Sequence, residues 1–111
     1  MQKDCIFCKI VAGEIPSDKV LETEHCIVIK DINPQAPIHL LVITKEHLDD
    51  ITRIEDREIA ADIIGAINKV ARELNLKDFR VVNNRGRGAG QSVFHVHFHI
   101  LAGRPFSWPP G

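Results

Sequence analysis

Three histidines alternate with apolar residues near the C-terminal end of the chain. They are His95, His97 and His99, within the segment FHVHFHIL at residues 94–101. Because side chains in a β-strand point alternately to its two faces, a strand here would place the three imidazoles on one face. Imidazole is a nucleophile, a proton carrier and a metal ligand at neutral pH, so the row is a candidate for each of these chemistries.

The spacing of these imidazoles limits what they can do together. Same-face positions of a strand lie about 6.6 Å apart, so His95 and His99 would be about 13 Å apart. We therefore do not expect all three to bind one metal ion, although two neighbours can. The row can equally line a groove in which each ring contacts a different atom of an extended polar substrate. A solvent-facing strand that is merely rich in histidine is the plainer alternative.

A glycine-rich loop at residues 84–91 (NRGRGAGQ) leads directly into the histidine segment. Its three glycines permit backbone conformations that other residues resist, and backbone N–H groups exposed in this way can surround an anion. A phosphate held there would lie beside His97. Taken alone, the loop also fits a flexible surface connection with weak RNA affinity. The candidate phosphate-binding residues are Asn84, Gly90, Gln91 and Ser92.

Cys5 and Cys8 form a C-x-x-C motif near the N-terminus. A thioredoxin-like redox site has this motif after a strand and at the start of a helix, and too few residues precede Cys5 to form that strand. A total of three cysteines is not a disulfide framework. A zinc ion needs four ligands, and without a second C-x-x-C the others would be histidines. Two buried thiols are the alternative, and Cys26 fits a core position.

The composition is that of an ordinary globular protein of 111 residues, 44% hydrophobic and 26% charged. This length predicts a single domain at residues 1–111. The net charge of -1 argues against binding to nucleic acid or to a membrane surface through a global field. The sequence contains no apolar run that could span a bilayer, and residues 1–4 lack the apolar core of a signal peptide. We therefore expect a cytoplasmic protein.

Apolar periodicity predicts two helices that help to position these groups. A short helix is expected at residues 6–12, with Asp4 at its start and Gly13 as a left-handed stop. A long helix is expected after the capping-box pattern at residues 52–55, with Asn75 near its end. Its buried stripe would consist of Ile59, Ile63, Ile67, Val70 and Leu74.

Short runs of branched apolar residues predict strands on both sides of the long helix. Turn-forming residues at 31–37, which include Pro34 and Pro37, separate two of these runs. This order favours an α+β domain with an antiparallel sheet over a series of βαβ units. The expected strands are residues 19–22, 26–30, 39–44, 79–83 and 92–101.

The chain resembles the histidine triad (HIT) family, and in particular its Hint-like branch. The family signature is His-φ-His-φ-His-φ-φ, where φ is apolar, and residues 95–101 match it at every position. The resemblance extends over nearly the whole chain. Further matching segments are IFCKI at 6–10, DINPQAP at 31–37, HLLVI at 39–43, GQS at 90–92 and WPPG at 108–111.

This resemblance implies a HIT-like α+β fold, with an antiparallel sheet of about five strands, one long helix and one short helix. It implies a homodimer with one continuous sheet, in which the tail at residues 103–111 lies near the partner's site. The implied activity is that of a purine nucleoside phosphoramidase. Such an enzyme hydrolyses adenylated amines and related compounds to AMP-type or GMP-type products through a nucleotidyl-histidine intermediate, and its catalysis requires no cofactor.

The resemblance also assigns roles to individual residues. His97 would attack the α-phosphorus, the backbone carbonyl of His95 would hold its ring, and His99 would donate to the phosphate or to the departing group. His39 would join the same cluster, and Asp31 would accept both ribose hydroxyls. Taken alone, Asp31 equally fits the start of a turn. The base pocket would be formed by Ile6, Phe7, Ile10 and Ile32, which are otherwise core residues by default.

Some members of the HIT superfamily carry a structural zinc site that uses an N-terminal cysteine pair and two histidines. The matching positions here are Cys5, Cys8, His47 and His95. Such a site would tie the N-terminal segment to the histidine strand. Two buried thiols and an exposed His47 remain the alternative.

Two other functions stay open at this point. One is the hydrolysis of dinucleoside polyphosphates, which characterises another HIT branch. The other is a nucleotide-binding regulatory or interaction module with little catalysis, although the intact histidine row argues against it. A sugar-phosphate nucleotidyltransferase is disfavoured, because those relatives have glutamine at the position of His99 and a duplicated, much longer chain.

Overall fold

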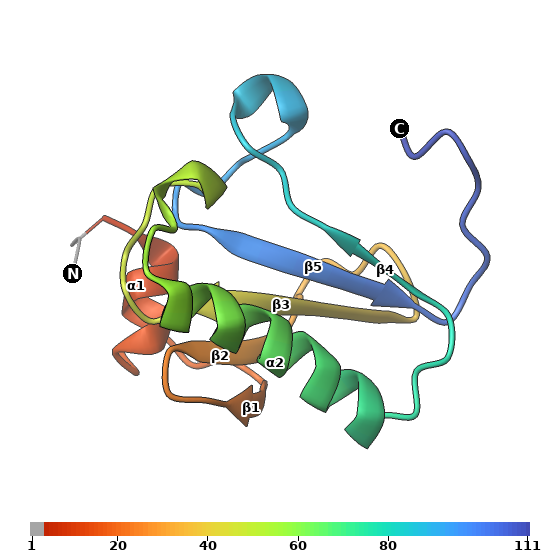
Figure 1. Ribbon diagram of the computed structural model, residues 1–111, viewed down its shortest axis with the longest axis horizontal. Coiled ribbons are helices and arrows are strands. Elements are labelled where there is room, and N and C mark those ends of the chain that lie inside the picture. Colours follow the sequence, from red (N-terminus) through yellow and green to blue (C-terminus); the bar gives the residue numbers. More distant parts are fainter. Residues whose placement is uncertain (1–3) are drawn as a thin grey trace.

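An antiparallel sheet forms the centre of the molecule (Figure 1). The computed structural model describes residues 4–111 and shows five strands there, in the spatial order β1-β2-β3-β5-β4. This confirms the predicted α+β fold with one long and one short helix. The strands are β1 (Lys19–Glu22), β2 (Cys26–Lys30), β3 (Ile38–Thr44), β4 (Phe79–Val82) and β5 (His97–Ala102). The helices are α1 (Ile6–Val11), α2 (Arg57–Glu73) and the 3₁₀ turns η1 (Ile51–Arg53) and η2 (Arg87–Ala89).

Helix α2 covers one face of the sheet. Four of the five predicted stripe residues are buried, and Leu74 is 43% exposed because it lies beyond the helix, at its C-cap. The helix does not begin with the predicted capping box. The carboxylate of Asp56 accepts from the backbone N–H groups of Glu58 and Ile59 instead, while Thr52 belongs to η1, which Asp50 caps. The stripe packs against Cys26, Val28, Leu40, Val42 and Ile100.

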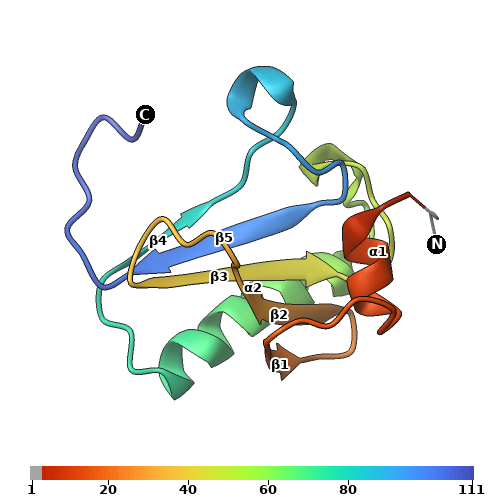
Figure 2. The ribbon, with the colours of Figure 1, turned by 180° about the vertical axis from the view of Figure 1, so that it is seen from behind.

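Helix α1 packs on the opposite face, at one end of the sheet (Figure 2). Phe7 is its main buried side chain and joins the cluster formed by Ile27, Ile29, Leu41 and Ile43. The helix starts at Cys5, whose sulfur accepts from the Cys8 N–H, and not at Asp4 as predicted. Gly13 follows the helix with a φ of +79°, which agrees with the predicted left-handed stop. Because α1 has only six residues, it covers only one end of this face.

Strand β5 begins five residues later than predicted, and this changes the position of His95. The Val96 N–H donates to the Leu48 carbonyl at 2.7 Å, outside the sheet, so the chain joins β3 only from His97 onward. The predicted row of three imidazoles on one strand is therefore wrong for His95. His97 and His99 do share a face, because they pair in register with Ile43 and Leu41 of β3.

The structure describes the C-terminal end of the chain up to Gly111, and its description begins at Asp4. Residues 1–3, part of the signal-peptide argument, lie outside the described part of the chain. At the other end, Gly103 turns the chain away from β5 with a φ of +93°, and a Cβ there would lie 2.8 Å from the Pro37 Cβ. Over residues 4–111, none of the helices has the length and apolar character needed to cross a membrane.

Candidate active site and metal centre

His97 lies buried on the α1 face of the sheet with one ring nitrogen fixed. Its Nδ1–H donates to the backbone carbonyl of His95 at 2.8 Å, which leaves the lone pair on Nε2. The Phe7 ring packs edge-on against this imidazole at 4.9 Å between centroids. Burial lowers the pKa of His97, with the His95 carbonyl and Asp31 acting in the opposite direction. A neutral imidazole with a free, oriented lone pair is suited to nucleophilic attack.

His99 and His39 form a second imidazole pair beside His97. The rings of His97 and His99 are 5.2 Å apart between centroids. The His39 Nε2 lies 2.8 Å from the His99 Nδ1, which joins strands β3 and β5 through a side-chain contact. The pKa of His99 is lowered to about 4, mainly by burial and also by the neighbouring His97 and His39, with Asp31 acting in the opposite direction. Burial also lowers the pKa of His39, so both rings are neutral around pH 7 and interact as hydrogen-bonding groups.

A pocket of about 280 Å³ opens beside these imidazoles. It is bounded by α1, the end of β2 and the segment before β5, and both His97 and His99 line it. Ile32 is 99% exposed at its rim, so the structure rejects its default interpretation as a core residue. The other predicted nucleotide-binding residues that line this pocket are Ile6, Phe7, Ile10, Asp31 and Ser92.

Asp31 serves as a turn residue and also lines this pocket. Its Oδ1 accepts from the Asn33 N–H at 2.8 Å, which closes the predicted turn. Its Oδ2 lies 3.4 Å from the His39 Nε2, so the carboxylate is tied to the imidazole pair. The two interpretations of Asp31 left open by the sequence are therefore compatible.

The loop at residues 84–91 is an organised turn, but none of its residues lines the 280 Å³ pocket. The Gln91 side chain accepts from the Gly86 N–H and donates to the carbonyls of Asp49 and Val93. These bonds use the carboxamide to hold the loop, so its predicted role as a donor to phosphate is not open to it in this arrangement. Gly90 has a φ of +96°, and its position lies next to the Asn84 side chain.

Sequence reasoning missed several residues that close the pocket. The segment between α1 and β1 contributes Ile15, Pro16, Ser17 and Asp18, and Val93 lies beside Ser92. Pro16 has a sequence signal, because proline cannot continue a helix, but that signal does not point to a pocket. The other residues have no periodic pattern, because they belong to connections and not to regular elements.

Cys5, Cys8, His47 and His95 come together at the N-terminal end of α1. Their sulfur and nitrogen ligand atoms all lie within 4.8 Å of one another. The Nδ1 of His95 is 3.3 Å from the Cys5 sulfur and 3.5 Å from the Cys8 sulfur, and the Nδ1 of His47 is 3.2 Å from the Cys8 sulfur. Tetrahedral zinc with ordinary bond lengths requires sulfur–nitrogen separations of about 3.5 Å. The donor set and its spacing therefore fit a structural zinc ion.

The outer ring nitrogens of the two histidines support this assignment. The Nε2 of His95 donates to the Thr44 carbonyl at 2.7 Å, and the Nε2 of His47 lies 2.9 Å from a carboxylate oxygen of Asp49. A proton on each Nε2 leaves each Nδ1 as a lone pair directed at the two sulfurs. Carbonyl and carboxylate partners of this kind orient histidine ligands of zinc in many proteins.

We expect protein purified without added metal to contain about one zinc per chain. The double substitution C5S/C8S should remove the zinc and lower the melting temperature by about 5 °C or more, because metal binding contributes to folding. Elemental analysis and calorimetry check this expectation. Cys26→Ala is the matched control, since Cys26 lies in the α2-facing core. It should change stability but leave the zinc content intact; metal-free wild type would contradict the assignment.

The depressed pKa of His99 predicts a pH dependence of stability. The unfolded chain binds a proton at this imidazole near pH 6.5, whereas the folded protein does so only near pH 4. Its contribution is therefore fully present above pH 6.5 and is lost as the pH falls toward 4. The free energy of unfolding should fall less steeply in His99→Asn than in wild type over this interval. Urea titrations at several pH values measure the difference, and parallel curves would contradict it.

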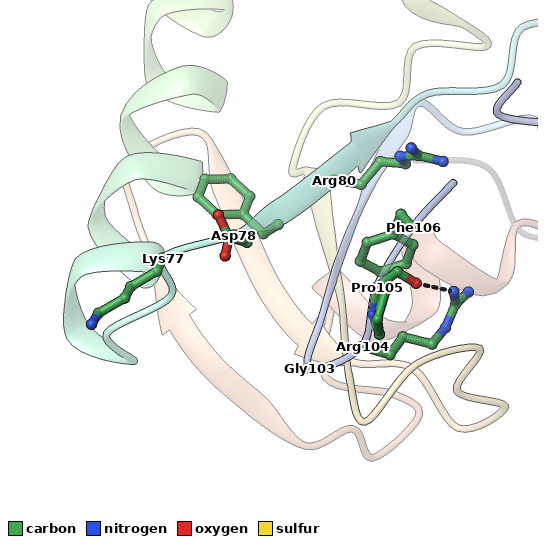
Figure 3. Close-up of a pocket in the computed structure, with 8 residues that line it drawn as sticks. Lys77, Asp78, Arg80, Gly103, Arg104, Pro105 and Phe106 are labelled. Carbon is green, nitrogen blue, oxygen red and sulfur yellow. Dashed lines mark hydrogen bonds between the residues drawn. The ribbon is translucent and has the colours of Figure 1, made fainter. Parts of the chain in front are cut away.

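A wider pocket of about 770 Å³ lies away from the histidines, between β4 and the C-terminal tail (Figure 3). The Phe106 ring lies between the guanidinium groups of Arg80 and Arg104, at 5.2 and 4.3 Å from its centroid. Arg80 also donates to the Ser107 carbonyl, which fixes the start of the tail. This pocket is lined by none of the predicted site residues.

The fold and the paired imidazoles define the class to which the protein belongs. The HIT domain family matches residues 12–106 of the chain. An uncharacterized HIT-like protein of Synechocystis sp. is 46% identical, with full coverage of both chains. The chain therefore belongs to the HIT domain family.

Solved structures agree with this assignment. A crystal structure of a HIT family hydrolase from Legionella pneumophila has a TM-score of 0.91 and 43% identity, and the match covers 97% of this chain and all of the other. A histidine triad nucleotide-binding protein from Candida albicans has a TM-score of 0.84 and 36% identity, covering 96% of this chain and 83% of the other.

Proposed function

We propose that the protein is a nucleotide-binding hydrolase of the Hint-like branch. Its substrates would be purine nucleoside 5′-phosphoramidates, cleaved through a nucleotidyl-His97 intermediate. The observation that carries the proposal is the bond from His97 Nδ1–H to the His95 carbonyl, which leaves Nε2 as the attacking atom beside a pocket. The hydrolase and nucleotide-binding descriptions of the two solved relatives support the same class.

The substrate would lie along the 280 Å³ pocket. The purine would pack against the apolar wall formed by Ile6, Phe7, Ile10 and Ile32. Asp31 would accept hydrogen bonds from the ribose hydroxyls, since its carboxylate has two acceptor oxygens. Ser92 lines the same pocket as His97 and would contact the phosphate. Asn84 and Gly90, which lie next to each other in the preceding loop, would contribute further contacts to it.

The reaction would proceed in two displacements. The Nε2 of His97 attacks the α-phosphorus, the P–N bond breaks, and the amine leaves with the electron pair and a proton from water. Water then attacks the nucleotidyl-histidine, which releases the nucleoside monophosphate and restores neutral His97. Forming a covalent intermediate divides one difficult step into two easier ones. No cofactor takes part, and the cysteine–histidine cluster would hold the N-terminal segment in place.

Incubation with a panel of adenylate derivatives tests this function. The panel contains an adenosine 5′-phosphoramidate, an aminoacyl adenylate and a diadenosine polyphosphate, and AMP release is measured for each. Phosphoramidate hydrolysis is the expected result. Binding of AMP without hydrolysis of any compound would favour the regulatory or interaction module.

We infer that the protein is a homodimer. Strand β4 forms an edge of the sheet, so its outer backbone groups can pair with a second copy. Val81 on this strand is half-exposed and offers an apolar side chain to the same contact. A domain of this size gains stability by burying more apolar surface between chains. Light scattering at micromolar concentration should report twice 12.5 kDa. Val81→Lys should shift the mass toward the monomer, and a monomeric wild type would contradict the inference.

A further inference from the structure

The cysteine–histidine cluster contains one buried and one accessible sulfur. Cys8 is 2% exposed, whereas Cys5 is only partly buried and lines a pocket of about 330 Å³ together with His47. The two sulfurs lie within 4.8 Å of each other. A small solute that enters this pocket therefore meets Cys5 first, with the Cys8 sulfur as its close neighbour.

The local backbone also brings the two sulfurs together. Cys5 caps α1, and the Cys8 N–H donates to its sulfur at 3.4 Å. C-x-x-C motifs are common sites of reversible disulfide formation. A thioredoxin-like enzyme also has a strand before the motif, but oxidation of the pair itself does not require one.

Zinc and a disulfide exclude each other at this cluster. A bound zinc ion holds both cysteines as thiolates. Disulfide formation uses both sulfurs and leaves only His47 and His95 of the four ligands, which is too few for a structural zinc site. Oxidation of the pair therefore expels the ion, and reduction restores the four ligands.

His95 connects this cluster to the candidate nucleophile. Its Nδ1 lies 3.3 Å from the Cys5 sulfur and 3.5 Å from the Cys8 sulfur, while its backbone carbonyl accepts from the His97 Nδ1–H at 2.8 Å. The Phe7 ring packs edge-on against both imidazoles, at 5.9 Å from His95 and 4.9 Å from His97 between centroids. Since Phe7 lies between the two cysteines in the chain, a change at the sulfurs reaches His97 through this ring and through the backbone of His95.

We propose that Cys5 and Cys8 form a peroxide-sensitive switch, in which oxidation to an intramolecular disulfide releases zinc and removes the support of His97. The oxidant is hydrogen peroxide. The Cys5 sulfur attacks one peroxide oxygen, the O–O bond breaks, and a sulfenic acid forms with hydroxide as the leaving group. The Cys8 sulfur then attacks the Cys5 sulfur and displaces a second hydroxide. The peroxide gains two electrons, and the two thiolates lose them.

Hydrogen peroxide added in equal amount to zinc-loaded protein tests the switch without any substrate. We expect a chromogenic chelator to detect the released zinc, and peptide mass mapping to find one disulfide, between Cys5 and Cys8. Reduction with a phosphine in the presence of zinc should restore the original state. Protein that takes up no zinc, or that keeps its zinc and its thiols under peroxide, would overturn the proposal.

Single substitutions distinguish the roles of the two sulfurs. In Cys8→Ser the accessible Cys5 has no partner, so peroxide should leave a sulfenic acid that dimedone traps. In Cys5→Ser the buried Cys8 should stay reduced. Cys26→Ala is the matched control, because Cys26 lies in the α2-facing core, and this variant should form the disulfide as wild type does. Equal reactivity of the two single variants would exclude Cys5 as the attacking residue.

Nitrogen-15 spectra of the imidazoles test the connection to His97. The Nδ1–H signal of His97 should shift or broaden on oxidation and return after reduction with zinc. His25 contacts Glu24 and Glu58 and is the internal reference, so its signals should not change. An unchanged His97 signal in disulfide-bonded, zinc-free protein would refute the connection.

The effect on turnover rests on the proposed function. Oxidised protein should hydrolyse an adenosine 5′-phosphoramidate more slowly by about tenfold or more, because a displaced nucleophile loses its alignment with the phosphorus. Activity should return after reduction with zinc. If the reduced protein hydrolyses no phosphoramidate, the proposed function fails, while zinc release and the His97 signal still decide the switch. Unchanged hydrolysis by fully oxidised protein would contradict the switch.

Discussion

Replacing His97 by alanine or asparagine is expected to lower kcat by about a thousandfold or more, equivalent to about 4 kcal/mol. The substitution removes the attacking nitrogen, which no neighbouring group can replace. The Nδ1 of His99 is already engaged by His39, and burial keeps its ring neutral. Steady-state hydrolysis of an adenosine phosphoramidate, with AMP affinity from calorimetry, measures both effects.

AMP affinity should change little in these variants, because the apolar wall, Asp31 and Ser92 remain. His25→Ala is the matched control, since this imidazole contacts Glu24 and Glu58 on the far side of the sheet. It should retain the wild-type turnover number. A His97 variant with near-normal turnover would exclude the covalent mechanism.

Substrate choice should separate the two enzymatic branches by a large margin. We expect kcat/KM for an adenosine 5′-phosphoramidate to exceed that for diadenosine polyphosphates by about a hundredfold or more. A small amine needs only a short pocket, whereas a polyphosphate needs an open, basic channel. In the proposed arrangement the nucleoside fills the 280 Å³ pocket, so the space beyond the scissile bond sets this preference.

The C-terminal tail would contribute to this preference in a dimer. It contains Pro105, Pro109 and Pro110, whose fixed φ angles stiffen it. Trp108 is 82% exposed in the single chain and is therefore available to the partner's site. Deleting residues 108–111 should lower the preference for phosphoramidates more than it lowers AMP affinity. A wild-type preference for diadenosine compounds would favour the other branch.

Local patterns were sufficient to predict most of the framework. Strands β1 and β2 have the predicted bounds, and the apolar stripe of α2 was correct from Ile59 to Val70. Such elements follow from period and turn chemistry, which are properties of short segments. The start of α2 was wrong because two capping patterns lie within five residues, and the choice between Thr52 and Asp56 depends on tertiary packing.

The site itself depended on contacts between distant segments. The alternating pattern predicted one strand over residues 92–101. In the structure the Val96 N–H bonds to the Leu48 carbonyl, so His95 lies outside strand β5. His95 then turns toward Cys5 and Cys8, nearly ninety residues earlier. The use of Gln91 inside the loop was likewise invisible, because its partners Asp49 and Gly86 become neighbours only on folding.

The stereochemical course at the α-phosphorus is the most direct test of the covalent mechanism. The substrate is a phosphoramidate that is chiral at its α-phosphorus because sulfur replaces one oxygen. It is hydrolysed in water labelled with an oxygen isotope, and the configuration of the phosphorus in the product is determined. Each in-line displacement inverts the phosphorus, so attack by His97 followed by attack by water predicts overall retention. Overall inversion would mean that water attacks the substrate directly, and would contradict the nucleotidyl-His97 intermediate.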